Sequence, residues 1–219
     1  MKIVIIGPGA IGCLFAALLT EAEYDVVLLD KDTTRARMIT KQGILIEQNG
    51  RTRNVRMPAT ADAAEIGPAD FACICVKAFD TRSAIARAMP LVGPHTAVIS
   101  LQNGLGNAEV LARAVEAERV ICAVTSQGAT GLGVAHVRHA GTGMTSVAPF
   151  SPSARSAAAP FARLFRKAGI GTEVLGDATS MLWGKLIISA SVNPVTAIAG
   201  VANGEVLNRP DLRDTAFAA

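Results

Sequence analysis

The chain has 219 residues, of which half are hydrophobic and 18% are charged. These values predict a globular protein with a sizeable core and exclude an intrinsically disordered one. The formal net charge is only +3, without a local run of Lys and Arg, so neither nucleic acid nor a membrane surface is expected as a partner. We therefore expect the partner to be a small molecule.

Four cysteines show neither a CxxC pair nor the spacing of metal ligands. They lie in apolar runs such as FACICV, which indicates reduced core residues and a cytoplasmic location. The apolar N-terminal stretch runs directly into a glycine-rich turn, unlike a secretory signal. Pro194 and scattered polar residues interrupt the longest apolar run, so we expect no membrane span.

The first 22 residues carry a nucleotide-binding pattern. KIVII (2–6) is typical of a strand buried on both faces, and CLFAALLTEA (13–22) of a helix, with GPGAIG between them. This is GxGxxG in the context that a dinucleotide fingerprint requires, with the helix N-terminus facing the phosphates. The first glycine allows the turn, the second leaves room for a pyrophosphate, and the third lets helix and strand pack closely. The predicted cofactor-binding residues of this turn are Gly7, Pro8, Gly9, Ala10, Ile11 and Gly12.

The second predicted strand, DVVLLD (25–30), ends on a charged pair that bears on the choice of cofactor. Asp30 would accept a hydrogen bond from the ribose 2′-hydroxyl of NAD, whereas Lys31 would hold the 2′-phosphate of NADP. The two residues favour opposite cofactors. The residues alone leave NADP and NAD both open.

Alternating strands and helices continue along the chain. GILIEQ (43–48) and NVRMPA (54–59) indicate strands that form a hairpin around Asn49-Gly50. DFACICVKA (70–78) and TAVISLQNG (96–104) indicate buried strands, with a helix at 81–92 between them.

Two polar residues, Lys77 and Asn103, follow these buried strands at their carboxyl ends. Ligands of open α/β sheets bind at that edge, so both are candidate site residues. A solvated cation and simple turn chemistry before Gly104 are the alternatives.

RVICAVT (119–125) predicts a further strand, followed by a Gly/Thr-rich stretch that carries His136 and His139 as HxxH. Without a third ligand or an adjacent acid, we expect strand or loop histidines and no metal site. A helix near 153–168 and a strand at 169–175 complete the alternation. We expect an α/β fold with a dinucleotide-binding domain at 1–176 and a separate region at 177–219.

After Gly176 the pattern changes to a helix at about 178–199 that is apolar nearly all round, which predicts burial against other protein. Lys185, Ser189 and Asn193 are spaced i, i+4, i+8 and share one face, which indicates a cleft. A lysine there could protonate a carbonyl oxygen if burial lowers its pKa; a lysine that snorkels to water is the alternative. Pro194 should distort the helix and free carbonyl groups.

Together these segments resemble the ketopantoate reductases (2-dehydropantoate 2-reductases). The resemblance rests on the order and spacing of seven motifs: GPGAIG, VKA (76–78), QNGLG (102–106), HAGTG (139–143), WGKL (183–186), NPVTA (193–197) and ANGE (202–205). It implies a Rossmann-like N-terminal domain, an all-α C-terminal domain, and reduction of ketopantoate to pantoate by NADPH on the pantothenate route to coenzyme A.

The resemblance also implies roles for individual residues. Lys185 matches the catalytic lysine, the general acid for the keto oxygen. The matching cofactor-binding positions outside the glycine-rich turn are Lys31, Lys77, Asn103 and Ala129, and the substrate positions are Lys185, Ser189, Asn193 and Asn203. Ser189 replaces an asparagine that is usual in the family, which shortens one hydrogen-bonding arm.

The family's C-terminal domain continues past Ala219, so we expect residues 177–219 to be only the beginning of that domain. A later serine and glutamate of the family's substrate site have no counterpart here. An incomplete helical domain would expose apolar surface, which predicts self-association, for example as a homodimer. Two other functions stay open: a reductase of another branched 2-oxo acid that uses NAD, and a nucleotide-binding protein without turnover.

Overall fold

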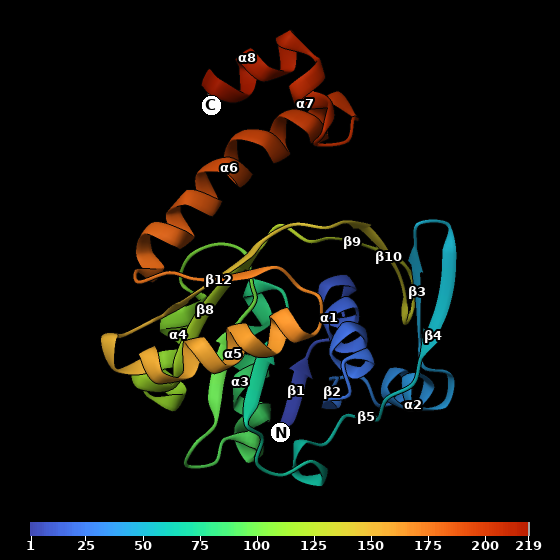
Figure 1. Ribbon diagram of the computed structural model, residues 1–219, viewed down its shortest axis with the longest axis vertical. Helices are drawn as coiled ribbons and strands as arrows, with labels where there is room; N and C mark the ends of the chain where they lie inside the picture. The colour runs from blue at the N-terminus through green and yellow to red at the C-terminus, as the bar shows by residue number, and fades with distance from the viewer. Residues whose placement is uncertain (219) are drawn as a thin grey trace.

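The computed structural model describes residues 1–218 and is built around an eight-stranded sheet (Figure 1). Around β1, the strands β2, β5, β6, β7 and β8 all run parallel, while β11 pairs antiparallel with β8. In spatial order the strands are β12 (Thr172–Val174), β11 (Thr145–Pro149), β8 (Val120–Thr125), β7 (Ala97–Ser100), β6 (Phe71–Ile74), β1 (Lys2–Ile6), β2 (Asp25–Leu29) and β5 (Ala59–Thr60).

Helices cover both faces of this sheet, because its central strands are apolar on both sides. In β1, Ile3 and Ile5 belong to one buried cluster and Val4 and Ile6 to the other. Side chains of α1 and α5 fill the first cluster, and side chains of α3 and α4 fill the second. The helices of this part are α1 (Ala10–Glu21), α2 (Thr33–Gln42), α3 (Thr81–Ala88), α4 (Asn107–Val115) and α5 (Arg155–Lys167), and the short 3-10 turns are η1 (Ala63–Glu65), η2 (Ala78–Asp80), η3 (Met89–Leu91), η4 (Ala117–Arg119) and η5 (Pro152–Ala154).

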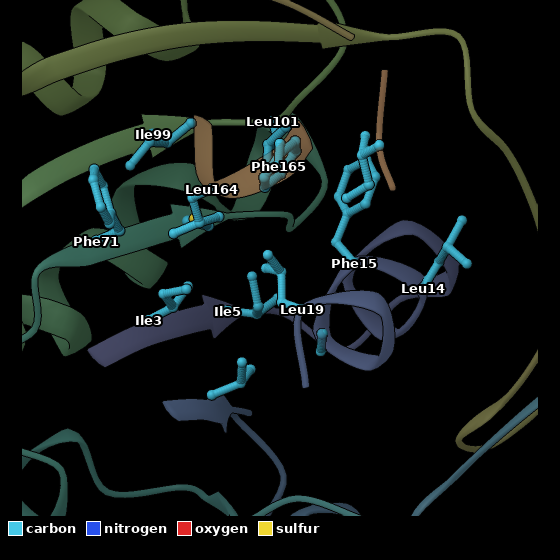
Figure 2. Close-up of a cluster of buried hydrophobic side chains, with 14 of the residues drawn as sticks. Ile3, Ile5, Leu14, Phe15, Leu19, Phe71, Ile99, Leu101, Leu164 and Phe165 are labelled. Carbon is cyan, nitrogen blue, oxygen red and sulfur yellow. The ribbon is translucent and has the colours of Figure 1, made fainter. Parts of the chain in front are cut away.

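Aromatic side chains pack α1 and α5 against each other and against the sheet. Phe165 lies 5.0 Å from Phe15 and 4.4 Å from Phe161, measured between ring centroids, and Phe161 lies 5.5 Å from Phe71. Figure 2 shows Phe15 on α1 and Phe165 among the aliphatic side chains above β1. This buried cluster packs α1 against the sheet, with its first turn at the end of β1.

A second sheet, in the order β4, β3, β10, β9, lies beside α1 (Figure 1). Its strands are β3 (Ile44–Gln48), β4 (Arg51–Val55), β9 (Gly128–Gly133) and β10 (His136–Gly141). The turn between β3 and β4 has positive φ at Asn49 (51°) and Gly50 (73°), as a two-residue hairpin requires. The predicted hairpin is confirmed, but its second strand begins at Arg51 instead of 54. The turn consists of Asn49 and Gly50 alone, so pairing with β3 starts at once, between Gln48 and Arg51.

The strands predicted at 70–78, 96–104, 119–125 and 169–175 and the helices predicted at 81–92 and 153–168 are present, with small errors at their ends. The helices α2 and α4 and the strand β11 were not predicted. The strands predicted at 70–78 and 96–104 stop at Ile74 and Ser100, so Lys77 and Asn103 lie in loops beyond them. His136 and His139 both lie on β10, as expected of strand residues.

Beyond the sheet, α6 (Ala178–Ala199), α7 (Glu205–Asn208) and α8 (Pro210–Ala218) project away from the α/β part (Figure 1). The side chain of Asp177 caps α6 by accepting from the backbone N–H groups of Thr179 (3.1 Å) and Ser180 (2.9 Å). The predicted bounds, 178–199, are confirmed.

The predicted burial of this helix is wrong. Within α6 only Ala178, Met181 and Thr196 are buried, and Ile187 and Ile188 are both 62% exposed. The reason is that the start of α6 packs on the second buried cluster of the sheet through Ala178 and Met181, and its end packs on α7 and α8 through Val192 and Val195.

The interruption expected at Pro194 is not found in α6, although the expectation of no membrane span is not overturned. The helix continues through Pro194 for 22 residues, so among the described residues it is the one helix long and apolar enough to cross a bilayer by length and composition. Core helices of soluble proteins pass the same test, which makes this weak evidence for a span.

Candidate active site

The glycine-rich turn has the geometry of a phosphate cradle. Gly7 has φ +97°, a conformation that side chains disfavour, and a Cβ on Gly12 would lie 2.2 Å from the Gly7 carbonyl oxygen. Gly9 is different, because a Cβ there would meet nothing within 4 Å. Gly7 and Gly12 are therefore required by the fold, whereas the bare face of Gly9 leaves open space for a ligand.

The backbone N–H groups at the start of α1 also indicate a phosphate site. The first intrahelical hydrogen bond of α1 runs from the Cys13 N–H to the Gly9 carbonyl oxygen (2.8 Å). The N–H groups of Ala10, Ile11 and Gly12 therefore have no partner within the helix, and no side chain caps it. Three free donors at the positive end of the helix dipole, beside the open face of Gly9, fit a dinucleotide pyrophosphate.

A pocket of about 200 Å³ opens at the carboxyl ends of β1, β2 and β6. The chain reverses its strand order here, since β2 lies on one side of β1 and β6 on the other. The cradle residues Gly7 to Gly9 line the pocket together with both predicted cations, Lys31 and Lys77. Four other charged residues line it as well. They are Asp30 at the end of β2, Arg35 on α2, Asp80 on η2 and Arg87 on α3.

Asp30 lines this pocket, but its carboxylate is not free for a ligand as the sequence suggested. Its side chain is 1% exposed and forms a two-pronged ion pair with Arg35, whose Nη2 donates to Oδ1 at 2.5 Å. Lys31 is 64% exposed and pairs with Asp80 at 3.0 Å. Sequence reasoning missed Arg35, although the i, i+5 spacing from the strand end into the next helix could have indicated it.

A buried polar network braces the loop that holds Asn103. The Nε2 of Gln102 donates to the Val76 carbonyl oxygen (2.9 Å) and to the Thr81 hydroxyl (2.8 Å). The Thr81 hydroxyl donates to the side chain of Asn107 (3.0 Å), and Asn107 Nδ2 donates to the Asn103 carbonyl oxygen (3.0 Å). The loops after β6 and β7 are thus tied together.

A second pocket, of about 290 Å³, joins the two parts of the chain. Lys185, Ser189 and Asn193 line it from α6, and Asn103 faces them from the loop after β7. The predicted polar face of α6 and the strand-end asparagine, 82 residues before Lys185, therefore meet in one cleft. The remaining lining residues are Ile11 of the cradle helix, Leu101, Thr125, Ser126 and Gln127.

Asn203 lies next to this cleft without lining it. Its Nδ2 donates to Asn193 Oδ1 (2.9 Å), and its own Oδ1 accepts from the Thr196 hydroxyl (2.7 Å). Asn193 and Asn203, predicted as two substrate positions, are thus coupled to one another. The remaining predicted site residue, Ala129, is half-buried on β9, two residues before Gly131, which passes close to Ala10.

Sequence reasoning missed Gln127, which lines the cleft at the end of β8. Its side chain accepts from His139 Nε2 (2.8 Å) and donates to the Gly143 carbonyl oxygen (2.6 Å). Burial lowers the pKa of His139, so the imidazole is held neutral as the Nε2–H tautomer. His139 therefore positions Gln127 through Nε2, while its buried Nδ1 has no hydrogen-bond partner among the described residues.

His136 also has a partner that the sequence did not reveal. Its Nε2 lies 2.9 Å from Glu47 Oε1, and Arg138 donates to the other oxygen of the same carboxylate. Arg138 and His136 hold the pKa of Glu47 below its usual range. Across residues 1–218 we find no cluster of three or more His, Cys, Asp or Glu side chains that could bind a metal.

Comparison with protein families gives two matches. The family described as "Ketopantoate reductase PanE/ApbA" matches residues 3–152, and its C-terminal counterpart matches residues 177–219. Curated relatives include the 2-dehydropantoate 2-reductase of Halobacterium salinarum, 34% identical over 96% of this chain and 69% of its own length. That of Archaeoglobus fulgidus is 33% identical over 99% of this chain and 70% of its own. The chain thus spans about 70% of these relatives.

Solved structures have the same architecture. The crystal structure of 2-dehydropantoate 2-reductase from Geobacter metallireducens matches with a TM-score of 0.88 and 28% identity, over 98% of this chain and 71% of that one. D-mandelate dehydrogenase with NADH and anilino(oxo)acetate matches with a TM-score of 0.90 over 99% of this chain and 70% of that one, but at 21% identity it shows the fold alone. The family matches, the relatives and the glycine cradle agree: the chain belongs to the ketopantoate reductase family, whose members are nicotinamide dinucleotide-dependent reductases of small oxo acids.

Proposed function

We propose that this chain is an NADPH-dependent 2-dehydropantoate 2-reductase, which reduces ketopantoate to pantoate in pantothenate biosynthesis. The observation that carries the proposal is the cleft in which Lys185, Ser189 and Asn193 face Asn103, with Ile11 of the cradle helix in its wall. A proton donor, hydrogen-bonding side chains and a dinucleotide cradle are the groups that reduction of a 2-oxo acid needs.

The cofactor fits the cradle and the adjoining pocket. Gly7 to Gly12 would hold the pyrophosphate, and Lys31 and Lys77 would bind phosphate oxygens at the adenosine end. Asn103 and Ala129 would border the part of the cofactor nearer the cleft. When bound, the nicotinamide supplies the hydride; the chain's own residues bind, orient and supply the proton.

Lys185 is the general acid of the proposal. It is half-buried in the wall of the cleft, where its ammonium can donate a proton to the keto oxygen of the substrate. Ser189 and Asn193 follow on the same face and would hydrogen-bond the substrate's polar groups. Asn203 would act by holding the Asn193 side chain through their 2.9 Å hydrogen bond.

Several broader assignments accompany this function. We place the boundary between a dinucleotide-binding domain, 1–176, and a helical substrate and dimerisation region, 177–219, in the segment between β12 and α6. The four free cysteines, three of them buried, suit a reducing cytoplasm. Exposed Ile187, Ile188 and Ile198 would favour self-association, with a homodimer as the simplest assembly.

A second candidate is a reductase of another branched 2-oxo acid. Ser189 favours it, because a serine in place of an amide side chain shortens one hydrogen-bonding arm of the cleft. NAD would be the cofactor if Asp30 turned toward the ribose. The third candidate is nucleotide binding without turnover, in which the cradle holds the dinucleotide but no oxo acid is reduced.

Initial rates with a panel of 2-oxo acids and both cofactors distinguish these candidates. We expect NADPH oxidation to be fastest with ketopantoate, because the lysine and amide groups of the cleft match a keto acid that also carries a hydroxyl. Faster turnover of another branched 2-oxo acid with NADH would establish the second candidate. NADPH binding without turnover of any oxo acid would establish the third.

Replacing the proposed acid tests the mechanism. Lys185→Met keeps the length of the side chain but removes its proton, so kcat should fall by about 10² to 10⁴, the usual contribution of a general acid. The Kd for NADPH should stay close to that of the unaltered chain. Lys41→Met on α2 is the control and should leave both values unchanged. A parallel loss of NADPH affinity in Lys185→Met would mean that the lysine is structural.

The open face of Gly9 gives a test of the cradle. Gly9→Ala adds a methyl group that meets no protein atom, so the melting temperature should not change, but the group enters the phosphate site. We expect NADPH affinity to fall at least about 10-fold, equivalent to about 1.4 kcal/mol. Gly12→Ala should instead lower the melting temperature, because its methyl group would strike the Gly7 carbonyl. Undiminished affinity in Gly9→Ala would mean that the phosphates bind elsewhere.

A further inference from the structure

We propose that Arg35 determines the cofactor choice of this chain: it covers Asp30 and presents its own guanidinium to the adenosine 2′-phosphate. The inference rests on the proposed dinucleotide-binding function and goes beyond it by assigning a specificity residue that lies outside the glycine-rich turn and outside the strand-end pair.

Asp30 is the residue that would select NAD, yet its carboxylate is already engaged. Arg35 Nε donates to Oδ2, Arg35 Nη2 donates to Oδ1 at 2.5 Å, and the Asp32 N–H donates to Oδ1 at 3.2 Å. A carboxylate has about four lone-pair positions, so three of them are filled. With its side chain 1% exposed, Asp30 offers no accessible acceptor to a ribose hydroxyl.

Arg35 is placed to serve the pocket instead. Its side chain is 36% exposed and lines the pocket at the end of β2. The two bonds to Asp30 use two of about five guanidinium donors, which leaves the others for a ligand. The buried carboxylate raises the pKa of Arg35, and a planar guanidinium that is already oriented binds phosphate with little loss of side-chain freedom.

The surrounding charges favour a dianion over a neutral hydroxyl. Lys31, Lys77 and Arg87 line the same pocket as Arg35, whereas the carboxylates are limited to Asp30 and Asp80. Asp80 is paired with Lys31 at 3.0 Å, so it too is engaged. The pocket therefore has an excess of positive charge, which a 2′-phosphate would neutralise and a 2′-hydroxyl would not.

Arg87 makes the arrangement rigid. Its Nη2 donates to the carbonyl oxygens of Asp30 (3.2 Å) and Ala61 (3.3 Å), which ties α3 to the end of β2. Asp30 cannot easily rotate its carboxylate into the pocket, because its backbone is fixed by Arg87 and its side chain by Arg35. Asp30, the residue that would otherwise favour NAD, thus orients the guanidinium of Arg35 for the phosphate.

Fragments that lack nicotinamide separate this inference from catalysis. We would measure calorimetric Kd values for adenosine 2′,5′-bisphosphate and for 5′-AMP, and take their ratio as the 2′-phosphate preference. The variants are Arg35→Gln, which keeps one hydrogen bond to Asp30 without the charge, and Asp30→Asn, which keeps Arg35. Arg37→Gln is the matched control, since Arg37 is exposed on the same helix and does not line the pocket.

Arg35→Gln should lower the 2′-phosphate preference about 10-fold or more, the scale of one charge-assisted hydrogen-bond pair, with 5′-AMP affinity unchanged. Asp30→Asn should leave 5′-AMP affinity unchanged, and Arg37→Gln should change neither Kd. The inference is overturned if Arg35→Gln keeps the preference, if it weakens both fragments equally, or if Asp30→Asn weakens 5′-AMP. If the unaltered chain itself prefers 5′-AMP, the proposed use of NADPH fails as well.

Discussion

The close contact between α1 and β1 sets the position of the phosphate cradle and of the loops around it. A Cβ on Gly12 would come within 2.2 Å of the Gly7 carbonyl, so only glycine lets the helix begin directly at the end of the strand. The aromatic cluster of Phe15, Phe161 and Phe165 holds the helix in that position. Because β2, β6, β7 and β8 run parallel to β1, their polar ends reach the same edge of the sheet.

Much of this could be predicted from the sequence, for identifiable reasons. KIVII followed by GPGAIG specifies strand, turn and helix through local chemistry, and the positive φ values of Asn49 and Gly50 follow from the turn they occupy. The face shared by Lys185, Ser189 and Asn193 follows from helical periodicity alone, and the structure confirms that all three line one cleft.

The rest depends on contacts between distant residues. Glu47 beside His136 and Gln127 beside His139 arise from pairings in a sheet that no local pattern reveals. The burial of Asp30 depends on Arg35 folding back from the next helix, so the residue type at the strand end predicted the wrong environment. The burial predicted for α6 was wrong because hydrophobicity does not say which element covers a helix.

The helix α6 connects nucleotide binding to the proposed chemistry. It starts beside the sheet, carries Lys185 into the cleft, and ends where Asn203 supports Asn193. Since Asn103 faces α6 from a loop fixed to the sheet by Gln102, Thr81 and Asn107, the cleft would respond to any change in the angle between α6 and the sheet.

If the cradle and the cleft form one site for hydride transfer, deuterium on the nicotinamide must pass to the substrate. Ketopantoate would be reduced by this chain with NADPH that carries deuterium on one or the other face of nicotinamide C4. We expect pantoate with one deuterium at C2 from one preparation and none from the other. Unlabelled pantoate from both preparations, or no pantoate from a chain that binds NADPH, would contradict the single site.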